Sequence, residues 1–140
     1  MPKYRKGTGP VPVPTPLTAP FWAATKEHRF LIQRCDACGH AFYYARTHCP
    51  ACLSKEWQWV ETSGRGTLYS YTVCRRAQSP DFAEDVPYIL AAVTLAEGPR
   101  VSSLLVEADP DNVRIDGPVE VVWDDEVSGE LSMPYWRPVA

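Results

Sequence analysis

Four of the five cysteines form two pairs with the same internal spacing, Cys35-x2-Cys38 and Cys49-x2-Cys52, with ten residues between the pairs. Two residues between paired cysteines allow both thiolates to reach one ion from a single tight turn, and two such turns complete a tetrahedron. Four thiolate ligands leave no open position for water, so the predicted site is a structural metal site. Zinc is favoured over iron, which similar turns also bind, and over a pair of disulfides.

The other reactive side chains do not form a catalytic arrangement that spacing alone supports. Cys74 stands alone in a strand-like run, and only Arg75 and Arg76 beside it bear on its reactivity, so we expect a buried and inert thiol. His28 is interpreted as a helix-end residue, and no Ser-His-Asp order or glycine-rich phosphate loop is recognisable. We therefore expect a chain without catalytic residues of its own.

Length and composition restrict the class of protein. The chain has 140 residues, of which 45% are hydrophobic and 22% charged, as expected for one globular domain or two very small ones. No apolar run approaches the roughly 18 residues of a membrane span, and the N-terminus lacks the apolar stretch of a signal peptide. We expect a cytoplasmic protein without membrane contact, in a reducing compartment where paired cysteines favour metal over disulfides.

The charge is unevenly divided along the chain. Residues 1–63 carry eight Lys or Arg against four Asp or Glu, a net +4, whereas residues 64–140 carry six against thirteen, a net −7. Affinity for a phosphate backbone comes from clustered Lys and Arg, so the acidic half argues against nucleic acid. A protein partner or a small ligand is favoured.

The pattern of residues predicts a mainly β fold in three parts. Prolines at every second position indicate an extended proline-rich arm over residues 1–17, and a short helix is expected from Thr18 to Phe30 with Thr18 as its N-cap. The helix and the four-cysteine zinc ribbon occupy residues 18–62, and a five-stranded, partly open barrel of the OB-fold type occupies residues 63–140. The strand-like runs that lead to this barrel are 57–75, interrupted at Gly64 and Gly66, 88–96, 100–107, 119–123 and 131–136.

Taken together, these residues resemble the DUF35 family of zinc-ribbon and OB-fold proteins that are associated with acyl-CoA enzymes. The resemblance covers about residues 18 to 138 and rests on Phe21-Trp22, the run 30–35, both cysteine turns, the run 59–73 and Gly98-Pro99-Arg100. Two departures are visible, because Leu53 stands where the family usually has glycine and the arm before Pro16 lies outside the shared pattern.

The resemblance implies an accessory subunit that binds a thiolase-superfamily enzyme and supports its activity or its handling of CoA substrates. Family members are similar to partners of acetoacetyl-CoA thiolases, of polyketide acyltransferases and of lipid-transfer-protein-like thiolases that carry out retro-aldol cleavage in steroid side-chain degradation. In the last group, the module is also found with a MaoC-like hydratase. The expected partners are thus a thiolase-fold subunit and, for that group, a MaoC-like hydratase, with acyl-CoA reached indirectly.

Large apolar side chains that a small barrel is not expected to bury completely are the candidates for the contact with a partner. They are Phe21, Trp22, Phe82, Tyr135 and Trp136. Arg65, Arg75 and Arg76 are the candidates for contact with a CoA phosphate or an acidic patch.

A nucleic-acid-binding module is the alternative hypothesis, because zinc ribbons and OB-folds both serve that purpose. Trp57 with Trp59, and Tyr69 with Tyr71, lie on one face of a strand and are suited to stacking on bases. The same alternation is typical of a core or interface face, and the charge balance favours the accessory subunit.

Overall fold

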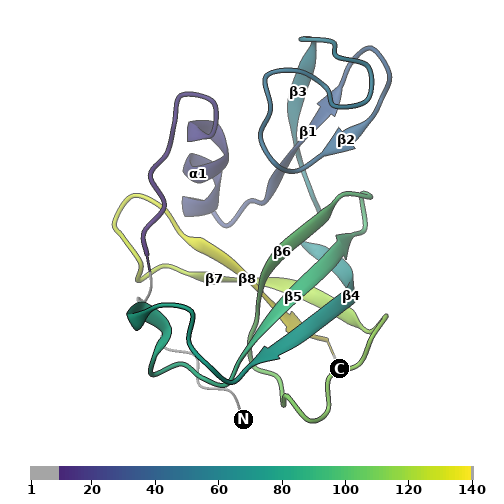
Figure 1. The fold of residues 1–140 in the computed structure, drawn as a ribbon. Coiled ribbons are helices and arrows are strands. Elements are labelled where there is room, and N and C mark those ends of the chain that lie inside the picture. The colour runs from purple at the N-terminus through teal and green to yellow at the C-terminus, as the bar shows by residue number, and fades with distance from the viewer. Residues whose placement is uncertain (1–9, 140) are drawn as a thin grey trace.

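The structure, a computed structural model, describes residues 10–139, so the first nine residues of the predicted arm lie outside it. It is mainly β, with one short helix, a three-stranded ribbon sheet and a five-stranded barrel (Figure 1). The elements are α1 (Ala19–Lys26), β1 (Leu31–Cys35), β2 (Ala41–Phe42), β3 (Trp57–Glu61), β4 (Arg65–Cys74), the 3-10 turn η1 (Pro80–Phe82), β5 (Tyr88–Leu95), β6 (Arg100–Leu105), β7 (Pro118–Asp124) and β8 (Met133–Pro138). The predicted fold class is confirmed. Among the described residues, no helix is long and apolar enough to cross a membrane.

The helix α1 begins after Thr18 as predicted but ends at Lys26, earlier than predicted. Thr18 precedes it, but its hydroxyl accepts a hydrogen bond from the Thr15 N–H at 2.8 Å and does not cap the helix. At the other end, the N–H of Arg29 bonds to the Ala24 carbonyl and that of His28 to Thr25, while His28 has a φ of +58°. This is a Schellman motif with histidine at the left-handed position that glycine usually occupies. The end of the helix therefore could not be located from a glycine in the sequence.

The ribbon sheet has the order β2-β1-β3, with β1 antiparallel to both neighbours. The run 57–75, predicted as one interrupted strand with the domain boundary between residues 62 and 63, is divided by the structure at Ser63-Gly64. Its first half, β3, completes the ribbon, and only its second half, β4, enters the barrel. Gly64 permits this change of direction because it has a φ of +75° and any Cβ there would lie 2.8 Å from Val121 Cγ1.

The barrel has the order β4-β5-β6-β8-β7 and is closed by the pairing of β7 with β4, whereas a partly open barrel was expected. Its weakest seam lies between β6 and β8, which share one parallel residue pair, Leu105 with Trp136. The side chain of Ser103 bridges the seam by donating to the Pro134 carbonyl at 2.8 Å. Gly66 is required where β4 meets β5, since a Cβ would lie 2.5 Å from the Thr94 carbonyl oxygen.

One hydrophobic core joins the barrel to the first half of the chain. Ile32 of β1 and Phe21 of α1 belong to the same buried cluster as Leu68 and Trp136 of the barrel. At the rim of this junction, the Nε2 atom of His28 lies 2.8 Å from Asp125 Oδ1, and its ring stacks on Trp123. The helix and the base of the ribbon are therefore packed directly on the barrel.

Candidate metal centre and partner surface

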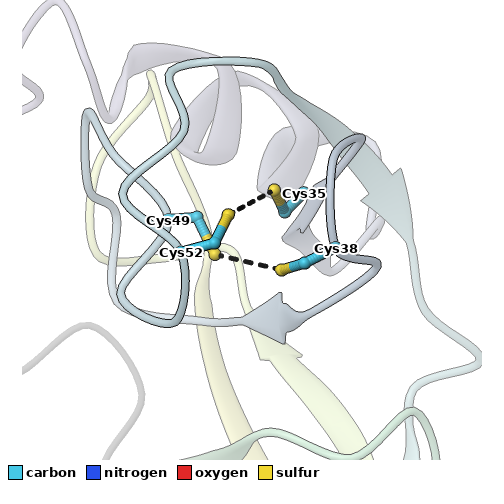
Figure 2. A group of neighbouring side chains, drawn as sticks. All are labelled: Cys35, Cys38, Cys49 and Cys52. Carbon is cyan, nitrogen blue, oxygen red and sulfur yellow. Dashed lines mark hydrogen bonds between the residues drawn. The ribbon is translucent and has the colours of Figure 1, made fainter.

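The four predicted ligands converge from two turns at one end of the ribbon (Figure 2). Their Sγ atoms all lie within 4.8 Å of one another, with Cys35 to Cys52 at 3.6 Å and Cys38 to Cys49 at 3.7 Å. A tetrahedral zinc ion with Zn–S bonds of about 2.3 Å requires sulfurs about 3.8 Å apart. The donor set and its spacing therefore fit a four-thiolate zinc centre, and Cys74 is separate from it.

The two turns repeat the same backbone pattern. In the first, the Cys35 N–H donates to the His40 carbonyl and the Gly39 N–H to the Cys35 carbonyl. In the second, Cys49 donates to Ser54, and Leu53 donates to Cys49. Gly39 and Leu53 occupy equivalent positions and have φ values of +78° and +66°. The local hydrogen bonds thus orient the two sulfurs of each turn toward a common point.

The electrostatics of the site favour a cation. Backbone N–H groups of Cys38 and Ala37 lower the pKa of the Cys35 thiol to about 7. The Ser54 N–H lowers the pKa of Cys52, but hydrogen bonds with the thiols of Cys35 and Cys38 outweigh it and raise that pKa to about 12. Four adjacent thiols cannot all ionise while they repel one another, so a bound cation is needed to hold four thiolates.

The histidines next to these turns are not ligands in this arrangement. His40 stacks on Phe42, with ring centroids 6.0 Å apart, and His48 Nδ1 lies 2.9 Å from the Thr47 hydroxyl. Within residues 10–139, the metal-binding group consists of cysteines alone.

A second polar cluster brings together His28, Asp125 and Ser132. Asp125 lies between the other two, because its carboxylate contacts both the His28 ring and the Ser132 hydroxyl. A nucleophilic serine needs the imidazole as its immediate neighbour, with the carboxylate behind it. The arrangement is therefore a link between the helix end and the β7–β8 loop, and it does not activate a nucleophile.

The structure separates the five aromatic residues predicted to contact a partner. Phe21, Tyr135 and Trp136 are 6%, 8% and 0% exposed, so the expectation that the barrel leaves them partly uncovered is wrong. Phe21 and Trp136 belong to the shared core, whereas Tyr135, on the opposite face of β8, is covered beside Phe82. Trp22 and Phe82 are half-buried and remain accessible.

Each of the two accessible aromatic residues lines a separate depression. Trp22 lines the aromatic hollow, a space of about 160 Å³ between α1 and the ribbon that Phe21, Tyr43, Tyr44 and Trp59 also line. Phe82 lines the mouth groove, about 210 Å³ at the β6–β8 seam, together with Tyr88, Tyr135 and Pro10 of the arm. Sequence reasoning missed both hollows, because the rings come from distant segments of the chain.

The three candidate arginines do not form one cluster. Arg65 begins β4, whereas Arg75 and Arg76 follow its end. At the rise per residue of a β-strand, the two ends lie about 30 Å apart along the strand. All three are exposed, and Arg75 lies 3.9 Å from Asp111. One CoA phosphate group therefore cannot engage all of them.

A four-cysteine zinc ribbon packed on a closed OB barrel defines the class of this protein. Comparison with family profiles matches residues 22–58 to "ChsH2, rubredoxin-like zinc ribbon domain" and residues 59–124 to "ChsH2, C-terminal OB-fold domain". A "DUF35 domain-containing scaffold protein" of Methanocaldococcus jannaschii is 36% identical over 104 residues, which cover 73% of each chain. The chain belongs to the DUF35 family, and the resemblance drawn from its residues is confirmed.

Two further relatives carry the names of enzymes. A "Probable enoyl-CoA hydratase alpha subunit" of Thermomonospora curvata is 40% identical over 119 residues, 84% of this chain but 36% of that protein. The chain thus matches little more than a third of that relative's length. A solved structure described as "Ltp2-ChsH2(DUF35) aldolase" contains a chain with 37% identity and a TM-score of 0.81, and the match covers 93% of this chain and all of that one.

Proposed function

We propose that this chain is a non-catalytic accessory subunit that binds a thiolase-superfamily acyl-CoA enzyme and supports its activity or its handling of CoA substrates. The observation that carries the proposal is the likeness to the DUF35 chain of an aldolase assembly over the full length of that chain. The finer proposal is a lipid-transfer-protein-like retro-aldolase of steroid side-chain degradation as the partner.

The metal in this proposal is one structural zinc ion held by Cys35, Cys38, Cys49 and Cys52. The sulfur spacing and the match to a zinc ribbon domain support it. When bound, the ion supplies no open coordination position, so its role is to hold the two turns together. Substrate chemistry is then left to the partner.

The proposed contact surface includes Trp22 at the aromatic hollow and Phe82 at the mouth groove. Both are large, accessible and set in apolar depressions, which is typical of side chains that dominate interfaces. Arg65, Arg75 and Arg76 remain proposed contacts for an acidic patch or a CoA phosphate, at two separate places. The domain division proposed is 18–62 for the helix and ribbon and 63–140 for the barrel.

The test is reconstitution with separately produced thiolase-superfamily proteins of the same genome. We expect one of them to form a complex on size exclusion and to gain turnover when this chain is added. Trp22→Ala and Phe82→Ala should each weaken that complex at least tenfold, while Tyr69→Ala, at a 50% exposed aromatic residue elsewhere on the barrel, should not. Equal activity with and without the chain, and no complex, would refute the accessory role.

A MaoC-like hydratase is a second candidate partner, because the hydratase alpha subunit named above contains a segment similar to this chain. The same reconstitution with such hydratases decides between the two, since only the true partner should shift the elution of the chain.

A further inference from the structure

Prolines alternate with other residues in the segment 10–16, which we name the proline strap. Pro10, Pro12, Pro14 and Pro16 are separated by Val11, Val13 and Thr15. Proline fixes its own φ near −65°, and a residue that precedes proline is confined to extended conformations. Val11, Val13 and Thr15 are therefore confined to an extended backbone before any contact is made, and the prolines between them have a fixed φ.

This alternation gives the two edges of the strap different hydrogen-bonding capacity. In an extended chain, successive residues direct their N–H and C=O groups to opposite edges, and both groups of one residue face the same antiparallel neighbour. One edge thus carries the N–H and C=O groups of Val11, Val13 and Thr15. The other edge carries the proline carbonyls without a single N–H, so a strand cannot add to it in register.

Hydrogen bonds anchor one end of the strap, and its other end lies beside the mouth groove. The Thr15 N–H donates to the Thr18 hydroxyl, the Thr18 N–H donates to the Thr15 hydroxyl, and the Ala19 N–H donates to the Thr15 carbonyl. At the other end, Pro10 lines the mouth groove beside Phe82. Figure 1 shows this segment descending from α1 past the β7–β8 loop toward η1.

The donors of the middle residues are not used within the part of the chain that the structure describes. Neither Val11 nor Val13 forms a hydrogen bond to another residue of the range 10–139. Their side chains are also uncovered, with Val11 48% and Val13 85% exposed. Two exposed β-branched residues with open backbone groups on one edge are what an incoming strand requires.

We propose that the proline strap adds as a terminal strand to an exposed sheet edge of the thiolase-type partner, with Val11 and Val13 supplying the paired backbone groups. The inference rests on the proposed function and adds how the partner is held. The unpaired N–H and C=O groups of the strap are complementary to the backbone groups of an exposed strand edge. Because the proline edge has no N–H donors, no further strand can add beyond the strap.

A second copy of this chain is a less suitable acceptor. The barrel is closed, and within residues 10–139 its loosest seam, between β6 and β8, is bridged by the Ser103 hydroxyl and the Val106 N–H. The ribbon sheet ends in β2, which has two residues, and in β3, which has five. Self-association through β3 or through the β6–β8 seam is the competing arrangement, and it is an outcome of the test below.

The test compares three variants of the full chain against the partner. Val11→Pro with Val13→Pro removes both N–H donors and should weaken the complex at least tenfold. Val11→Ala with Val13→Ala keeps the donors and should weaken it about threefold. Pro12→Ala, which adds a donor on the opposite edge, should leave the affinity within twofold. Zinc content and the unfolding midpoint should be unchanged in all three, because the strap lies outside the core.

Hydrogen exchange gives an independent readout of the pairing. Because of the prolines, only Val11, Val13 and Thr15 have exchangeable amides in this segment, and those of Val11 and Val13 should slow at least tenfold in the complex. Unchanged exchange, or an alanine variant as weak as the proline variant, would overturn strand addition in favour of side-chain contact.

The remaining outcomes separate the strap from the accessory role itself. A complex whose affinity the proline variant leaves unchanged overturns the strap and keeps the accessory role. No complex with any thiolase-type protein overturns both. A homodimer of the chain alone that the proline variant abolishes would assign the strap to a second copy and overturn the assignment to the partner.

Discussion

The ribbon and the barrel are held together by different means. The outer ribbon has a buried cluster of only Cys35, Phe42 and Cys49, with Trp57 packed against it. The barrel shares a continuous apolar core with α1 and β1 that includes Leu68, Ile89, Val93, Leu105 and Trp136. Burial of apolar surface stabilises the second region, whereas the first buries too little and depends on its four thiols. A fold of this size therefore combines an apolar core with a segment that we expect a bound metal to complete.

Removing the metal should have the largest effect, because it should unfold the ribbon and leave the barrel folded. We expect one zinc per chain and its loss in Cys38→Ser, because structural zinc sites contribute on the order of 10 kcal/mol or more to folding. Hydrogen exchange should then become fast between Cys35 and Gln58, while β5 and β6 keep their protection. Elemental analysis measures the zinc.

Cys74→Ser provides the matched control, because Cys74 lies outside the thiol group and pairs with Tyr88 in the barrel sheet. This variant should keep its zinc and the wild-type exchange pattern. A metal-free protein with a fully protected ribbon would contradict the proposed division of roles.

Trp136→Ala tests how much the apolar core contributes to the stability of the barrel. Trp136 has no exposed surface and contacts Phe30 at a centroid distance of 5.9 Å, so its removal leaves a cavity in the shared core. We expect a loss of about 3–5 kcal/mol in the free energy of unfolding, measured by urea denaturation. Ile115→Ala, at a 48% exposed residue, should change it by less than about 0.5 kcal/mol. If Trp136→Ala were as stable as the wild type, Trp136 would not belong to the core and would again be a candidate for contact with a partner.

Local patterns predicted more of this molecule than long-range packing did. The metal ligands were predictable because spacing within each turn decides whether two sulfurs reach one ion, and the barrel strands because alternation is a local property. The burial of Trp136 was not predictable, since it depends on Phe30 and the barrel strands meeting across more than a hundred residues. The left-handed conformation of His28 was not predictable from its residue type, because glycine usually occupies that position of a Schellman motif.

The junction between the two regions contains a tyrosine whose titration tests how tightly they pack. Burial raises the pKa of Tyr43, and the neighbouring Tyr44 adds to the rise. The folded state therefore favours the neutral phenol. Its contribution is fully present below the unfolded pKa of about 10 and is lost as the pH rises from there toward the folded value.

We expect the wild type to lose up to about 1.4 kcal/mol of stability per pH unit above about pH 10 relative to Tyr43→Phe. The measurement is urea unfolding of both proteins at about pH 8 and about pH 11. Tyr69→Phe, at a 50% exposed residue of β4, is the control and should follow the wild type. Equal alkaline losses in wild type and Tyr43→Phe would show that water reaches the junction.

The smallest expected effect lies at the tip of the second cysteine turn. Leu53 has a φ of +66° and is 73% exposed, so it combines an unfavourable backbone conformation with an apolar side chain in water. The equivalent residue of the first turn is Gly39, which adopts the same conformation without a steric penalty. A left-handed leucine costs roughly 1–2 kcal/mol, and the greater freedom of glycine in the unfolded chain offsets about 0.4–1 kcal/mol of any gain. Leu53→Gly should therefore raise the free energy of unfolding by about 0.5 kcal/mol and slow zinc release to a chelator, whereas Leu53→Val should lower it. If Leu53→Gly gains stability but binds the partner more weakly, Leu53 contacts the partner. If Leu53→Gly loses stability, the leucine side chain supports the turn.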